Sequence, residues 1–83
     1  MTMPTLEQRV THILSRVAMV PQARVTPDAE LAALGMQSLD QIECVLSVEE
    51  EFQVELPQAD LWRLRTVQDV IDAVRGAMAA GGR

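Results

Sequence analysis

The stretch LGMQSLDQIE, residues 34–43, places a serine directly before the apolar run of a predicted helix. Ser-Leu-Asp-Gln has the pattern of a capping box, in which Ser38 accepts from the Gln41 amide and the Gln41 side chain accepts from the Ser38 amide. Gly35 lets the chain turn sharply just upstream and leaves the hydroxyl exposed. A helix N-terminus also favours added negative charge. Ser38 is therefore either a helix cap or the attachment point of a phosphate-bearing group, and these residues alone favour the cap.

The helix predicted over 38–52 has two apolar faces when its residues are placed about 100° apart. One arc is wide enough to serve the core and holds Cys44, Val45, Val48 and Phe52. The second arc holds Leu39, Ile42 and Leu46. Its borders are the carboxylates of Glu43, Glu49 and Glu50. An apolar strip between carboxylates favours an exposed docking surface for a basic partner, and the alternative is a wider buried face beneath the preceding loop.

The remaining periodicity predicts an all-α fold, a small bundle of three main helices plus one short helix. Apolar residues at helical spacing, with Thr5 and Gln8 as a capping box, predict a first helix over 5–19. A short helix over 59–64 would place Leu61 and Leu64 inward.

Thr66 is the expected N-cap of a last helix over 67–78. Its apolar stripe is Val67, Val70, Ile71, Val74 and Met78. The tail from about residue 79 is expected to fray.

The connection over 20–37 is long for so small a domain, and long ordered loops are usually held down or functional. We expect it to pack on the domain through Val25, Leu31 and Leu34. Thr26 and Pro27 favour the start of a short helical turn within it.

Length and charge restrict the class of protein. With 83 residues the chain forms one domain, 1–83, too small for a large catalytic cleft. The net charge is −5, and nine of the twelve acids fall between Arg24 and Arg63 with no base among them. Such a charge repels nucleic acid and anionic lipid and attracts basic proteins. With one cysteine and no long apolar run, we expect a cytoplasmic protein that inserts into no membrane.

Neither the cysteine nor the histidine of the chain lies in a pattern that indicates chemistry. Cys44 lies on the core arc, and no histidine is close to it in sequence. His12 falls on the polar side of the first helix and has no second ligand for a metal. We therefore expect neither catalysis nor a metal site. Trp62 suits a partly buried position and an exposed partner contact about equally.

Taken together, these residues resemble the acyl carrier proteins over nearly the full length of the chain. The family motif Leu-Gly-x-Asp-Ser-Leu-Asp stands here as Leu-Gly-Met-Gln-Ser-Leu-Asp at 34–40. The family's spacing then continues through Glu43, the EEEF block at 49–52, a Leu-Pro pair at 56–57 and Thr-Val-x-Asp-Val at 66–70.

The resemblance implies that Ser38 carries 4'-phosphopantetheine, transferred from coenzyme A by a phosphopantetheinyl transferase, and that its thiol holds acyl groups as thioesters. It implies a monomer that presents this cargo to fatty-acid, polyketide or related biosynthetic enzymes through basic patches on those enzymes. The surface that meets them would be Leu39, Asp40, Ile42, Glu43, Leu46, Glu49 and Glu50. An acyl chain would fold back into a cleft lined by Val45, Val48, Leu64 and Ile71.

The chain departs from the family pattern at two places. Gln37 precedes the serine where most members have Asp, so a charge often read by the transferase is missing. The segment around the short helix carries Gln58, Ala59, Trp62, Arg63 and Arg65 where primary fatty-acid carriers tend to be acidic or neutral. Two alternatives therefore stay open: a carrier of aminoacyl or peptidyl groups in a specialised pathway, and an unmodified acidic adaptor protein.

Overall fold

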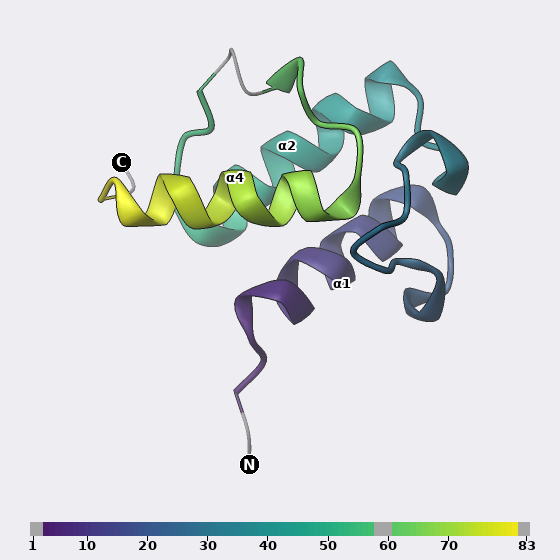
Figure 1. Cartoon of the computed structure of the whole chain (residues 1–83), viewed down its shortest axis with the longest axis horizontal. Coiled ribbons are helices and arrows are strands. Elements are labelled where there is room, and N and C mark those ends of the chain that lie inside the picture. The colour runs from purple at the N-terminus through teal and green to yellow at the C-terminus, as the bar shows by residue number, and fades with distance from the viewer. Residues whose placement is uncertain (1–2, 58–60, 82–83) are drawn as a thin grey trace.

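The computed structural model describes residues 3–57 and 61–81, and three α-helices dominate this part of the chain (Figure 1). They are α1 (Leu6–Ala18), α2 (Ser38–Phe52) and α4 (Val67–Ala79). Two 3-10 turns, η1 (Gln22–Arg24) and η2 (Ala32–Leu34), lie in the long connection before α2. The described residues contain no strand beyond one isolated bridge, so the prediction of a small helical bundle is confirmed.

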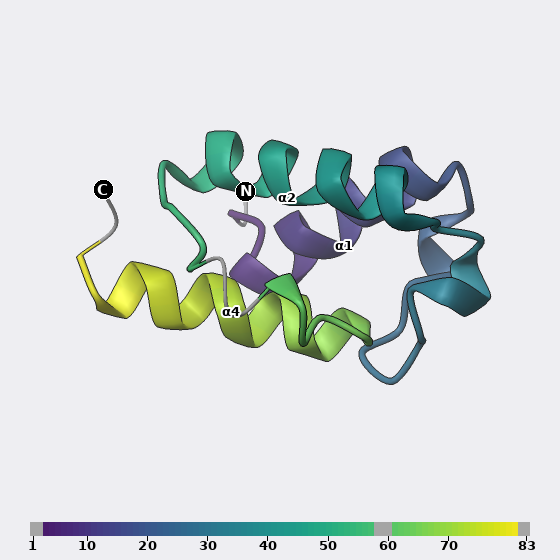
Figure 2. The ribbon, with the colours of Figure 1, turned by 90° about the horizontal axis from the view of Figure 1, so that it is seen from above.

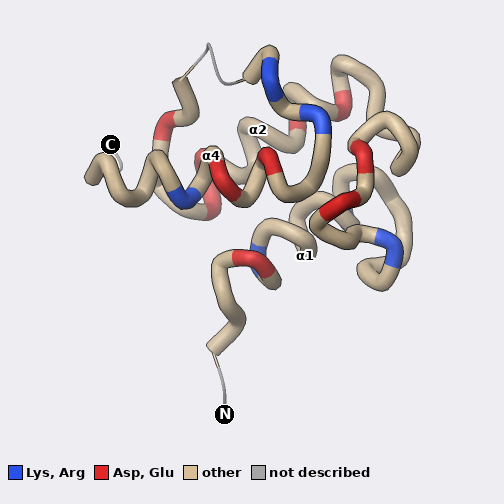
Figure 3. The backbone as a smooth tube through the Cα atoms, viewed as in Figure 1, with Lys and Arg blue, Asp and Glu red and all other residues tan. Residues whose placement is uncertain are grey.

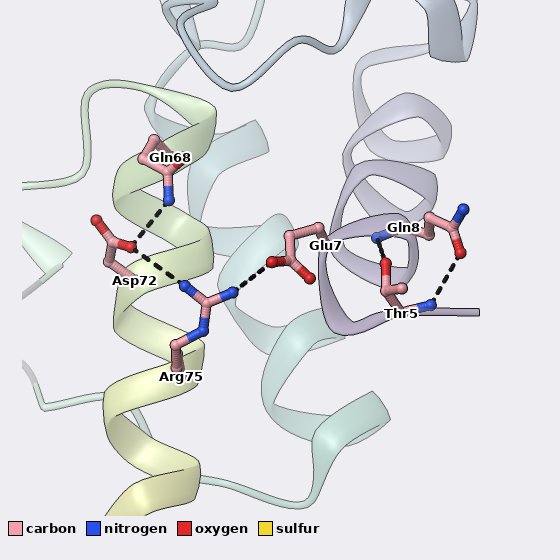
Figure 4. Close-up of polar contacts among 6 residues, drawn as sticks. All are labelled: Thr5, Glu7, Gln8, Gln68, Asp72 and Arg75. Atoms are coloured by element: carbon pink, nitrogen blue, oxygen red, sulfur yellow. Dashed lines mark hydrogen bonds and ion pairs between the residues drawn. The ribbon is translucent and has the colours of Figure 1, made fainter. Parts of the chain in front are cut away.

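Helix α1 begins at the predicted capping box. The Thr5 hydroxyl accepts from the Gln8 amide at 3.1 Å, and the Gln8 side chain accepts from the Thr5 amide at 2.8 Å (Figure 4). The helix ends where Met19 adopts a left-handed conformation, with φ of 58°. The prediction over 5–19 is therefore one residue too long at each end, because both end residues are caps.

Helix α4 begins at the predicted cap as well, and the Thr66 hydroxyl accepts from the Asp69 amide at 3.2 Å. Its inner face differs from the prediction in the last turn, where Ala77 is buried and Met78 is 45% exposed. Only one side of the last turn meets the core, and that side carries Ala77. The helix runs to Ala79, one residue into the tail that we expected to fray, and residues 82–83 lie outside the described ranges.

The core is aliphatic apart from Phe52 and Cys44, and no polar side chain is buried among the described residues. All four residues of the predicted core arc of α2 are buried. Burial raises the pKa of the Cys44 thiol to about 12, which keeps it protonated and unreactive. The helical periodicity did not indicate three further core residues from the connections: Met36, Val54 and Leu56.

The long connection packs on the bundle as predicted, with Val25, Leu31 and Leu34 buried. Figures 1 and 2 both place it at the end of the bundle where α2 and α4 begin. Backbone hydrogen bonds fix it there, from the Leu31 amide to the Arg65 carbonyl at 2.8 Å and from the Val67 amide to the Ala29 carbonyl at 2.9 Å.

The helical turn predicted at Thr26 and Pro27 is wrong in position. These residues form a single hydrogen-bonded turn, closed by the Ala29 amide and the Thr26 carbonyl at 3.0 Å, and the 3-10 turn comes later, at Ala32–Leu34. The Pro27 carbonyl instead accepts from the Gln68 amide of α4 at 2.9 Å. Because this carbonyl pairs with α4, it closes no helical turn with the residues that follow Pro27.

Among the described residues, two ion pairs join α1 to the other helices on the surface. Arg9 reaches Glu51 at 2.9 Å and also lies 4.3 Å from the centre of the Phe52 ring. Arg75 of α4 pairs with Glu7 of α1 (Figure 4). All four charged side chains are substantially solvent-exposed, so each pair adds at most about 1 kcal/mol to stability.

The short helix predicted over 59–64 falls partly on residues 58–60, which lie outside the described ranges. Beyond them, Leu61 and Leu64 are half-buried against the core, as predicted. Trp62 is 85% exposed, so the interpretation as a partly buried residue is wrong.

Candidate attachment site and docking surface

Ser38 is the first residue of α2 rather than its cap. Gln37 is the N-cap, with extended backbone, and its carbonyl accepts from the Gln41 amide at 2.9 Å to close the first helical turn. The carboxylate of Asp40 accepts from the Gln37 amide at 3.0 Å. The predicted capping box of Ser38 and Gln41 is therefore wrong, because the cap lies one residue earlier and Asp40 takes the part expected of Gln41.

This shift leaves the Ser38 hydroxyl free. Ser38 is exposed, and its hydroxyl forms no hydrogen bond with any residue the structure describes. Gly35 turns the chain upstream with φ of 84°, and the buried Met36 holds the turn against the core. Ser38 thus stands in the first turn of a helix, where free amides and the dipole stabilise an attached phosphate.

The second apolar arc of α2 is exposed. Leu39 is 75% exposed, Leu46 60% and Ile42 57%, and these three form a strip that begins directly after Ser38. The alternative of a wider buried face is wrong, because the long connection packs at the start of α2 and does not cover this strip. Exposed leucine and isoleucine in a row are typical of a protein-binding surface.

The acidic residues predicted for this surface differ in their solvent exposure and in the hydrogen bonds of their carboxylates. Glu43 and Glu50 are exposed, whereas Asp40 and Glu49 are only partly exposed. Asp40 caps the helix, and the Glu49 carboxylate accepts from the Leu56 amide at 2.8 Å. Figure 3 shows acidic positions along α2 and no basic position on that helix.

A groove of about 540 Å³ runs along the surface between α1 and α2. Its lining comes from both helices and from the residue that ends α2: Ile13, Arg16, Val17, Glu43, Ser47, Glu50, Glu51 and Gln53. This groove did not follow from the sequence, because it depends on how the two helices pack. Glu43 and Glu50 both belong to its lining.

The predicted acyl-chain residues all belong to the core region. Val45, Val48 and Ile71 are buried, and Leu64 is partly buried against the same core cluster. The structure thus brings them into one apolar region between α2, α4 and the segment before α4.

The described residues contain no group of three or more side chains that could hold a metal ion. His12 is exposed on α1, on the polar side where the sequence placed it. In the part of the chain that the structure describes, every helix is too short or too polar to cross a membrane.

Comparison with known proteins assigns the family. Residues 8–74 match the family model described as the phosphopantetheine attachment site. The solution structure of an oxytetracycline acyl carrier protein superposes with a TM-score of 0.75 over 100% of this chain and 90% of that one, at 21% identity, which shows a shared fold. Domains of this kind carry covalent 4'-phosphopantetheine and are carriers rather than catalysts. The free serine hydroxyl at the start of α2 lies within the matched range, and the chain belongs to the phosphopantetheine attachment family, with the acyl carrier protein fold.

Proposed function

We propose that the protein is an acyl carrier in which Ser38 bears the 4'-phosphopantetheine. The observation that carries this proposal is the Ser38 hydroxyl, exposed and without a hydrogen-bond partner among the described residues, at the start of a helix inside the matched range. When bound, the group supplies a flexible arm whose thiol holds the cargo as a thioester.

The role of the chain itself in attachment is to present the hydroxyl and then to stabilise the phosphate. Ser38 Oγ forms a bond to the phosphorus next to the pantetheine half of coenzyme A. The bond from that phosphorus to the 3',5'-ADP half breaks, 3',5'-ADP leaves, and the hydroxyl proton passes to the transferase. The first amides of α2, which have no partner within the helix, would favour the negative charge of a phosphodiester attached at Ser38.

The proposed docking surface consists of Leu39, Asp40, Ile42, Glu43, Leu46, Glu49 and Glu50. Support comes from the exposure of its three apolar side chains and from its position next to Ser38. Enzymes that load or process the cargo would meet this surface with basic patches, because an acidic border attracts them and sets their orientation.

The cargo proposal is an acyl chain that enters the apolar region formed by Val45, Val48, Leu64 and Ile71. An aliphatic interior with no buried polar side chain among the described residues supports an apolar cargo. Fatty-acid and polyketide synthesis are the pathways we propose, the second because the structural neighbour is an oxytetracycline carrier. We also propose a monomeric single domain, 1–83, in the cytoplasm, where the free thiol of Cys44 would stay reduced.

Intact mass after incubation with coenzyme A and a broad-specificity phosphopantetheinyl transferase tests the attachment site. We expect a gain of one phosphopantetheine in the wild type and none in Ser38→Ala. Ser47→Ala is the matched control, since it removes a serine from the same helix, and it should gain the full mass. No gain with any transferase would contradict the proposal and favour the unmodified adaptor.

Ile42→Asp tests the docking surface. Ile42 is 57% exposed, so the variant should keep its helical circular dichroism while loading by the transferase falls severalfold. Val48→Asp is the control for a buried position on the same helix and should unfold the protein. Unfolding of Ile42→Asp would place that residue in the core.

A further inference from the structure

We propose that the chain has a second binding surface, separate from α2, that takes an acidic partner protein. This Trp62 surface consists of Trp62, Arg63 and Arg65, on the segment that leads into α4. The proposal goes beyond the carrier function, because it does not depend on attachment at Ser38. The partner would offer an apolar pocket for the indole and carboxylates for the two guanidinium groups.

The indole is presented to solvent by its neighbours. Trp62 is the only tryptophan of the chain and is 85% exposed. Leu61 and Leu64, on either side of it, are half-buried against the core cluster. The two leucines anchor the segment and leave the indole outside. Tryptophan is enriched where partner proteins bind, because its ring buries a large apolar area on contact.

Backbone hydrogen bonds hold this segment in place. The Arg65 amide donates to the Asp69 carboxylate at 3.0 Å, and the Arg65 carbonyl accepts from the Leu31 amide at 2.8 Å. The next residue, Thr66, is the N-cap of α4. A surface that is ordered before binding loses little conformational freedom when a partner arrives, so more of the contact energy appears as affinity.

The two arginines provide the positive charge of the surface. Arg63 and Arg65 are exposed, and their guanidinium groups form no hydrogen bond or ion pair with any described residue. Arg63 lines a hollow of about 240 Å³ together with the acids Asp69 and Asp72. Both of these carboxylates accept hydrogen bonds at the start of α4 instead. Carboxylates for the two arginines would therefore come from a partner.

The Trp62 surface lies apart from the docking surface of α2. In Figure 2 the segment before α4 lies against α4 and away from α2. Figure 3 shows basic positions on this segment, whereas the positions along α2 are acidic. Leu64 and Ala73 contribute apolar side chains to the lining of the hollow beside Arg63. The two surfaces thus differ in place and in sign of charge, and they suit different partners.

The charges of the chain favour a protein as this partner. The net charge of −5 repels an anionic membrane and nucleic acid, although the indole and the arginines would suit both. A protein segment can place a few carboxylates beside apolar side chains and contact the Trp62 surface alone. Salt screens the more distant acids of the chain within about 8–10 Å, so the local pairs decide.

Selection from a random peptide library displayed on phage, with the full chain as bait, tests the proposal. We expect peptides with several Asp or Glu residues next to aliphatic ones. Such peptides should shift the emission of Trp62 to shorter wavelength, because the indole leaves water. Peptides that bind α2 are recognised by their loss of binding to Ile42→Asp. Dissociation constants of labelled peptides are measured by fluorescence anisotropy.

Variants then locate the binding of the acidic peptides. Trp62→Ala should weaken it about tenfold or more, and Arg63→Gln and Arg65→Gln about three- to tenfold each. Arg24→Gln is the matched control, because it removes the same charge from an exposed position outside the surface. It should change binding less than about twofold. Since all four side chains are exposed, every variant should keep its helical circular dichroism.

Several results would overturn the proposal. A selection without acidic peptides contradicts it, and so does binding of acidic peptides that survives Trp62→Ala. Equal weakening by Arg24→Gln would show an effect of net charge alone. A shift of the Trp62 emission with protein concentration alone would assign the surface to a second copy of the chain. A shift with phosphatidylglycerol vesicles but not with peptides would assign it to a membrane. The mass gain at Ser38 is independent of each of these results.

Discussion

At the scale of single residues, the sequence predicted two roles for Ser38, the helix cap and the attachment point. In the structure different residues at the start of α2 provide them. Asp40 provides the hydrogen bond that anchors the helix start, and Gln37 provides the carbonyl that begins it. The hydroxyl of Ser38 is then available for esterification without loss of a cap. Modification should therefore leave the stability of α2 unchanged or raise it.

The overlap of two patterns explains why the sequence misplaced this cap. Ser38 with Gln41 and Gln37 with Asp40 have the same three-residue spacing, and serine is the better cap by preference. Local preference cannot decide which residue is the N-cap. The decision depends on where the chain enters the helix, and the buried Met36 and the left-handed Gly35 determine that position. Those positions are set by the packing of the connection.

Asp40→Ala tests the anchoring role. We expect it to lower the free energy of unfolding by about 1 kcal/mol, because it removes one hydrogen bond and a favourable charge at the helix N-terminus. Asp40→Asn should lose less, since its oxygen can still accept from the Gln37 amide. Urea unfolding followed by circular dichroism measures both, and equal stability of all three proteins would contradict the role.

At the scale of elements, the sequence predicted the helices well and the connections poorly. Predicted helix bounds agree with α1, α2 and α4 to within one residue, because periodicity and capping residues are local signals. Val54 and Leu56 were missed as core residues, since no period marks them. The bridge of Glu30 to Thr66 could not be predicted, because it joins segments far apart in the chain.

The N-terminus of α4 makes part of the stability depend on pH. Asp69 accepts from the amides of Thr66 and Arg65, and these hydrogen bonds, the Thr66 one first, hold the pKa of its carboxyl below the usual value. A lowered folded-state pKa gives stability that is present above the unfolded-state pKa of about 3.9 and is lost as the pH falls through the folded-state value.

Asp69→Asn should therefore lose stability at pH 7 and show a smaller further loss than the wild type as the pH falls below about 4. Urea unfolding at pH 7, 4 and 3 measures this change. Glu55→Gln is the control, because it removes an exposed carboxyl that forms no hydrogen bond among the described residues. If the free energy of unfolding of Asp69→Asn fell with pH as steeply as that of the wild type, the role of this cap would be contradicted.

At the scale of the whole molecule, α2 serves both the core and the partner surface, and the two tasks use opposite faces. Val48 is fully buried on one face, and Leu39 is three-quarters exposed on the other. The periodicity of the sequence reveals both faces, and the carboxylates that border one of them indicate that this face lies outside. The helical periodicity assigns them correctly here, because carboxylates on both borders of a strip are rare in a core.

Leu14→Ala and Leu46→Ala form a pair that separates stability from recognition. Leu14 is fully buried and Leu46 is 60% exposed, so we expect a loss of about 2–5 kcal/mol for the first and less than about 0.5 kcal/mol for the second. The free energy of unfolding of a domain of this size is roughly 4–12 kcal/mol. Leu14→Ala should therefore unfold at a far lower urea concentration than the wild type. Loading by the transferase should show the reverse order, with Leu46→Ala impaired and Leu14→Ala active while folded. Equal destabilisation by both variants would show that the exposed strip is part of the core.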